Sequence, residues 1–140
     1  MIHIKIFSPG KIKETWLNMA IREYLKRLSS LAKVELIFTK DIKQFVKFAH
    51  EEKNLICLDP RGKLLNSEDF TYYFFKAVEQ GGSSLSFAIG GAEGFPYGVT
   101  DKRPLLSLSP MTFTHQQTRL LLLEQIFRAF EIHKGSPYHK

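Results

Sequence analysis

Residues 86–95 read SFAIGGAEGF, which places a glycine-rich turn directly after an apolar run. The run at 85–89 predicts a buried strand, and Gly90-Gly91 ends it. Glycine-rich turns after strands often bind phosphate, but the carboxylate of Glu93 would repel an anion. The turn also lacks the G-x-G-x-x-G spacing, and the chain has no P-loop motif. Two interpretations stay open: a turn with a solvated glutamate, or a site for a cation, a neutral ligand or the hydroxyls of a ribose.

Outward from this turn, short apolar segments alternate with amphipathic ones. We expect strands at residues 2–7, 34–38, 55–58, 85–89 and 105–108. We expect helices at residues 14–28, 41–52, 67–79 and 114–133, the last with Thr114 as its N-cap. This alternation predicts an α/β fold with a mostly parallel sheet and helices on both of its faces. The 140 residues contain no repeat and no linker, so we expect residues 1–140 to form one domain.

Three segments with unusual composition end predicted strands. They read LDPRG at 58–62, GGAEG at 90–94 and LSPMTF at 108–113. Open α/β sheets bind their ligands outside the carboxyl ends of the strands. Glycine at such an end lets the backbone approach a ligand closely, because no Cβ intervenes. The three segments are therefore the candidate binding site.

Composition narrows the class of protein. The net charge of +6 and the pI of about 9.5 favour a polyanionic partner such as nucleic acid. Cys57 is the only cysteine and the five histidines lack ligand spacing, so we expect neither a disulfide nor a metal site. No apolar run approaches the roughly 20 residues of a membrane span, and the N-terminus has no signal-peptide pattern. We expect a cytoplasmic protein with no membrane partner.

Four segments, in their order along the chain, carry a family resemblance. They read LDPRG at 58–62, IGGAEG at 89–94, LSLSPMTFTHQ at 106–116 with Arg119 after it, and PYHK at 137–140. Together they resemble the ribosomal large-subunit pseudouridine N3-methyltransferase family of the SPOUT class, and the resemblance covers nearly the whole chain. Thr114 stands where members often carry proline. The segment 95–104 is short, so we expect the helix usual there to be shortened or lost.

The resemblance implies a C-terminal segment threaded into a deep trefoil knot, and a homodimer. It also implies that S-adenosylmethionine binds in the knot as methyl donor. This cofactor carries a sulfonium cation and no phosphate, which suits a glycine-rich strand end with a carboxylate nearby. Carried over by position, its contacts are Leu58, Gly90, Leu108, Ser109, Pro110, Met111, Thr112 and Phe113.

The implied reaction methylates N3 of a pseudouridine in the large-subunit (23S) rRNA of the ribosome. His139 is a candidate base, Tyr138 offers a stacking face or a hydroxyl, and Arg119 would steady a phosphate or the developing anion. The candidate RNA contacts are Lys140, Arg128 and Lys134. In a dimer, we expect the C-terminal end of one subunit to lie near the cofactor loop of the other.

Two alternative functions remain open beside the methyltransferase hypothesis. A non-enzymatic ribosome- or RNA-binding module with the same fold would share the charge, and a small nucleotide-binding protein is a weaker third candidate. His115 is expected to be a surface or interface residue in the first turn of its helix. The helix at 114–133 is apolar on more than one side, which predicts a partner subunit as its second cover.

Overall fold

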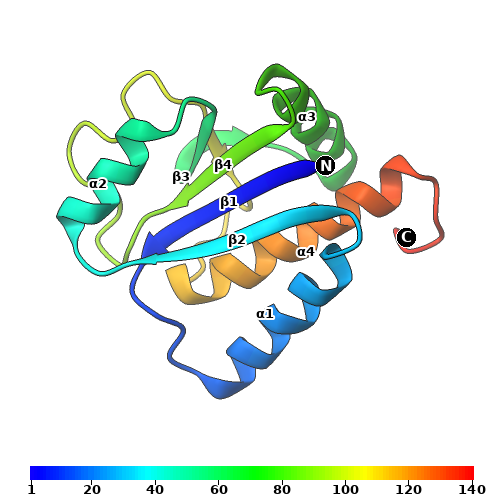
Figure 1. Ribbon diagram of the computed structural model, residues 1–140, viewed down its shortest axis with the longest axis horizontal. Helices are drawn as coiled ribbons and strands as arrows, with labels where there is room; N and C mark the ends of the chain where they lie inside the picture. Colours follow the sequence, from blue (N-terminus) through cyan, green and yellow to red (C-terminus); the bar gives the residue numbers. More distant parts are fainter.

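The fold is centred on a five-stranded sheet in the order β2-β1-β4-β3-β5 (Figure 1). The computed structural model describes all 140 residues. Every neighbouring pair of strands is parallel, which confirms the predicted α/β class. The strands are β1 (Ile2–Pro9), β2 (Ala32–Thr39), β3 (Leu55–Leu64), β4 (Ser84–Ile89) and β5 (Leu105–Ser107).

Four helices connect or follow the strands: α1 (Thr15–Leu28), α2 (Ile42–Glu51), α3 (Ser67–Gln80) and α4 (His115–His133). Asp41, Asn66 and Thr114 each accept a hydrogen bond at the helix start from the backbone N–H three residues on. The N-cap of α1, Glu14, makes no such bond. None of the four helices is long and apolar enough to cross a membrane.

Helices cover both faces of the sheet, as predicted. Figure 1 shows α1 and α4 on one side and α2 on the other. The larger core cluster joins α1, α3 and α4 to side chains such as Ile4 and Phe87. The smaller cluster joins α2 to Phe7, Cys57 and Val99 on the opposite face. Burial raises the pKa of the Cys57 thiol to about 11, which agrees with an inert core residue.

Most of the apolar side chains of α4 are covered within the chain. Leu122, Ile126 and Phe130 are buried against the sheet, α1 and α3. The Phe130 ring meets the edge of Phe74 at a centroid distance of 5.7 Å. Leu121 is half-buried and belongs to neither core cluster, so the homodimer stays a prediction.

The segment between β4 and β5 contains no helix, as expected from its length. It packs as turns against α2 and the second face of the sheet. Val99 is buried there, and the Arg103 guanidinium donates to the backbone oxygens of Ala49 (3.0 Å) and Lys53 (3.3 Å). These contacts hold the segment in place without regular structure.

β3 is longer than predicted, because the expected end at Leu58 is an interruption in the strand. Leu58 and Lys63 both pair with Leu106 of β5, so residues 59–62 bulge out of the ladder. Gly62 is the last residue of the bulge, directly before pairing with β5 resumes at Lys63. A Cβ on Gly62 would lie 2.5 Å from the backbone carbon of Leu105 and the backbone nitrogen of Leu106. Only glycine lets β5 approach this closely.

We predict that Gly62→Ala lowers the free energy of unfolding by about 3 kcal/mol or more, because the overlapping atoms are backbone and cannot rotate away. Urea unfolding followed by circular dichroism measures this. Gly91→Ala is the matched control, since a Cβ there meets only a proline side chain at 3.5 Å. Equal stability of the two variants would contradict the role given to Gly62.

Candidate functional site

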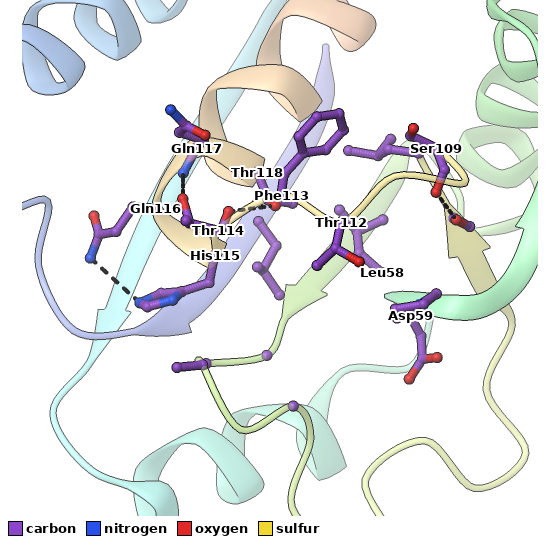
Figure 2. A pocket seen from close by; sticks show the side chains of 18 of the residues that line it. Leu58, Asp59, Ser109, Thr112, Phe113, Thr114, His115, Gln116, Gln117 and Thr118 are labelled. Carbon is purple, nitrogen blue, oxygen red and sulfur yellow. Dashed lines mark hydrogen bonds between the residues drawn. The ribbon is translucent and has the colours of Figure 1, made fainter.

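A pocket of about 810 Å³ opens at the carboxyl ends of β3, β4 and β5. This volume lies within the range of small-molecule sites. Figure 2 shows the end of β3 on one side of the pocket and the first turn of α4 on the other. All three segments singled out in the sequence contribute to its lining. Their convergence follows the rule that open parallel sheets bind ligands at this edge.

Leu58 and Asp59 lie where the first part of β3 ends and its bulge begins. Leu58 is buried and belongs to the main core cluster. The Asp59 carboxylate accepts two hydrogen bonds from the Arg61 guanidinium at 2.9 Å and one from the Arg61 backbone N–H at 2.8 Å. These bonds to Arg61 lower the pKa of the Asp59 carboxyl, which therefore stays ionised at neutral pH.

The glycine-rich turn after β4 forms the next wall. The Gly94 N–H donates to the Gly91 oxygen at 2.9 Å and closes a tight turn. A Cβ on Gly90 would lie 2.8 Å from the Gly94 carbonyl carbon, so the closure of the turn itself requires this glycine. Glu93 is exposed in the turn and lies outside the pocket lining. The carboxylates that line the pocket belong to Glu14 and Asp59 instead.

The loop after β5 provides polar backbone atoms. Ser109 organises the loop: its oxygen accepts from the Ser107 hydroxyl at 3.0 Å, and its hydroxyl accepts from the Met111 N–H at 2.9 Å. No backbone group between Leu108 and Phe113 hydrogen-bonds to another backbone group. Apart from the Ser109 oxygen and the Met111 N–H, which bond to serine side chains, the amides and carbonyls of this loop are available to a ligand. Among the predicted contacts of the loop, only Pro110 does not line the pocket.

The first turn of α4 closes the pocket and includes His115. Burial, followed by the nearby charges of Arg119 and Lys13, lowers the pKa of this imidazole. His115 is therefore neutral at neutral pH and able to accept a proton. His115 was expected at the surface or at an interface, and it lines the pocket.

The start of α1 forms the remaining wall. Glu14 and Trp16 line the pocket, and the Trp16 side chain is 55% exposed. Trp16 is the only tryptophan of the chain. Sequence reasoning missed both residues, although they follow the first strand and so lie at the same edge of the sheet as the other loops.

Arg119 lies under this wall and is fully buried. Its guanidinium donates to the Ser8 hydroxyl and to the Pro9 and Gly10 carbonyls, each at 2.7 Å. It also donates to the Gln116 amide oxygen at 3.1 Å. All four partners are uncharged, and burial lowers the pKa of Arg119 to about 10. Arg119 thus ties the β1–α1 connection to α4, and it does not line the pocket.

The predicted residues at the C-terminal end lie apart from the pocket of their own chain. Tyr138 and His139 contact α4 and the start of α3, and neither lines the pocket. Arg128 is half-buried beside them. Lys134 is exposed and pairs with Glu131 at 3.1 Å, and Lys140 is exposed at the end of the chain. The structure thus brings together the predicted cofactor residues, but it does not bring them together with the predicted catalytic ones.

Comparison with known proteins identifies the family of the chain. The family model described as "Predicted SPOUT methyltransferase" matches residues 2–139. The chain belongs to the SPOUT methyltransferase family. It is accordingly a methyltransferase, and the resemblance drawn from the strand-end segments is confirmed.

Curated relatives cover the full chain. A ribosomal RNA large subunit methyltransferase H from Protochlamydia amoebophila is 51% identical over 140 residues, which is all of both chains. Proteins of the same name from Halothermothrix orenii and Pelotomaculum thermopropionicum are 40% and 38% identical, over 98% and 99% of this chain and 99% of their own. Those two alignments span 157 and 159 positions, so they contain gaps that the 140-residue match lacks.

We predict that Arg119→Met lowers the free energy of unfolding by about 3 kcal/mol, because four hydrogen bonds of a buried charged group are lost at once. Arg119→Lys should recover only part of this, since an ammonium lacks the planar fork that reaches several acceptors. Urea unfolding measures both.

The side chain of Arg22 on α1 is exposed and makes no hydrogen bond, so this residue offers the control. Arg22→Met should change the free energy of unfolding by no more than about 0.5 kcal/mol. If Arg119→Met were as stable as Arg22→Met, Arg119 would not be the tether described.

Proposed function

We propose that this methyltransferase acts on N3 of a pseudouridine in large-subunit ribosomal RNA, with S-adenosylmethionine as methyl donor. The observation that carries the proposal is the convergence of the three family segments on one pocket. The names of the curated relatives and the net charge of +6 support an rRNA substrate. On this proposal residues 1–140 are one catalytic domain that acts in the cytoplasm, where ribosomes are.

The residues of the pocket fit this cofactor. Leu58, Ile89 and Leu106 offer an apolar slot for a purine. The free backbone groups of the 108–113 loop suit the polar edge of an adenine. Asp59 and Glu14 offer carboxylates to ribose hydroxyls or to the positive charge of the donor. S-adenosylmethionine, when bound, supplies a methyl group activated by its sulfonium.

The chain itself must orient the acceptor base and remove the N3 proton. His115 is the neutral imidazole in the pocket lining, so we assign it the role of proton acceptor. The His115 and Gln116 N–H groups at the start of α4 make no backbone hydrogen bond, and together with the helix dipole they would favour the imide anion that forms. The exposed Trp16 ring at the rim provides a stacking face for a base.

We infer further that two chains form the working enzyme. Trp16 and Met19 share one side of α1 and are 55% and 67% exposed, and Met111 beside the pocket is 76% exposed. A second copy of the chain would cover these side chains and bring its C-terminal residues 138–140 to this pocket. That arrangement would unite the predicted catalytic residues with the cofactor loops.

We also infer that the C-terminal segment is threaded as a trefoil knot. β5 follows β4 in the chain but pairs on the far side of β3, where Gly62 admits its backbone. The chain then passes the ends of β3 and β4 before it enters α4. A knotted path would hold the 108–113 loop in the shape that the cofactor requires.

Trp16 should report cofactor binding, since it is the only tryptophan and lines the pocket. We predict that S-adenosylmethionine changes its fluorescence saturably, and that Thr112→Trp, which fills the pocket with an indole, abolishes binding measured by calorimetry. ATP is the control ligand. Tighter binding of ATP than of S-adenosylmethionine would favour the nucleotide-binding alternative over this proposal.

The reaction is tested by transfer of labelled methyl from S-adenosylmethionine to ribosomes that lack the modification. We predict label in N3-methylpseudouridine of the large rRNA, and its loss when residues 138–140 are deleted, with cofactor affinity nearly unchanged. Ribosome binding without label would favour the non-enzymatic module. If the deletion of residues 138–140 abolished both cofactor binding and methyl transfer, or left both intact, the role given to these residues would be contradicted.

A further inference from the structure

The C-terminal residues are fixed to their own chain by a continuous hydrogen-bond network. The Tyr138 hydroxyl donates to Glu124 Oε2 at 2.8 Å. Glu124 Oε2 also accepts from Arg128 Nη2 at 2.8 Å. Arg128 Nη1 lies 3.0 Å from His139 Nδ1, and His139 Nε2 lies 2.7 Å from Glu68 Oε1. We call these five residues the tail latch. It joins the chain end to α4 and to the first turn of α3.

Aromatic contacts reinforce the network. The Tyr138 ring meets Phe127 edge-on at a centroid distance of 5.0 Å, and the Arg128 guanidinium lies 4.9 Å from the Tyr138 ring centroid. Burial, with Tyr24 and Glu124 as neighbours, raises the pKa of the Tyr138 hydroxyl. The hydroxyl therefore keeps its proton and remains a donor to Glu124. A frayed chain end would make none of these contacts.

The groups that face the two ring nitrogens of His139 determine which nitrogen carries the proton of the neutral imidazole. A guanidinium has only donors, so Nδ1 must accept from Arg128 and cannot carry a proton. In a neutral imidazole the proton then lies on Nε2, where it is donated to the Glu68 carboxylate. This bond lowers the pKa of the Glu68 carboxyl, which stays ionised as the acceptor. Both ring nitrogens are thus engaged within the chain.

We propose that Glu124, Arg128 and Glu68 are positioning residues that hold Tyr138 and His139 in the working conformation. In this conformation His139 is an orienting group and not the base that accepts the N3 proton. The inference rests on the proposed function in one respect, which is that the C-terminal residues take part in methyl transfer. It adds to that function a reason why their geometry is fixed before the substrate binds.

The latch itself can be tested without any activity. Long-range proton–nitrogen spectra of imidazole-labelled protein distinguish which nitrogen carries the proton, with His139→Gln to assign the signal. We expect His139 to be protonated on Nε2 alone at neutral pH. We also expect carboxypeptidase to remove the last residues much faster from Glu124→Gln than from the unmodified chain. A rapidly averaging tautomer, or equal digestion, would overturn the latch.

Activity then tests the positioning role. Glu124→Gln should lower kcat roughly ten- to hundred-fold, with the KM for S-adenosylmethionine unchanged, because only the alignment of the tail is disturbed. Glu23→Gln is the matched control: Glu23 and Arg27 on α1 form the same i,i+4 pair at 2.8 Å, but Glu23 makes no hydrogen bond to the tail. An unchanged or increased kcat in Glu124→Gln would contradict positioning.

A second pair of variants separates orientation from proton transfer. His139→Gln supplies one acceptor for Arg128 and one donor for Glu68, so it should retain most of kcat and leave the pH profile unchanged. His139→Ala should lose at least roughly tenfold. An equal loss of kcat in His139→Gln and His139→Ala, together with loss of the acidic limb of the pH profile of kcat, would make His139 the base and overturn the proposal. If the unmodified enzyme transferred no methyl at all, the spectra would still decide the latch while the proposed function failed.

Discussion

The approach of the β5 backbone to Gly62 is the constraint on which the site depends. Without a Cβ at Gly62, β5 can pair with β3 on both sides of the bulge at 59–62. This pairing places the chain after β5 beside the ends of β3 and β4. The pocket exists because three strand ends that are far apart in sequence share one edge of the sheet. A larger residue at Gly62 would separate them.

Arg119 provides the second constraint, since it fixes the pocket wall formed by the start of α1. Its guanidinium binds the Pro9 and Gly10 carbonyls and so ties the start of α1 to α4. The wall that carries Glu14 and Trp16 is thereby set against the turn that carries His115. A buried cation with only uncharged partners is costly to desolvate, and its hydrogen bonds offset that cost. The same helix holds the tail latch farther along, so α4 connects the pocket proposed to bind the cofactor with the chain end.

Much of the fold could be predicted from the sequence, because apolar periodicity alone marks nine elements in the right order. The meeting of the three segments at 58–62, 90–94 and 108–113 could also be predicted, and all three line one pocket. Three features could not. The bulge in β3 depends on contact with β5, and the burial of Arg119 depends on hydrogen bonds to Ser8 and Gly10, which lie 111 and 109 residues away in the chain. The place of His115 depends on how α4 meets α1. Each arises from tertiary packing, which local pattern does not contain.

In the proposed dimer, one subunit supplies the pocket and its partner supplies the C-terminal residues 138–140. Mixed dimers of Thr112→Trp, whose pocket is filled, and a chain lacking residues 138–140 test it directly. Each variant alone should transfer no methyl. The mixture should regain transfer, because a mixed dimer contains one open pocket facing one intact tail. A mixture that stays inactive, although mass spectrometry shows mixed dimers that bind S-adenosylmethionine, would contradict the account.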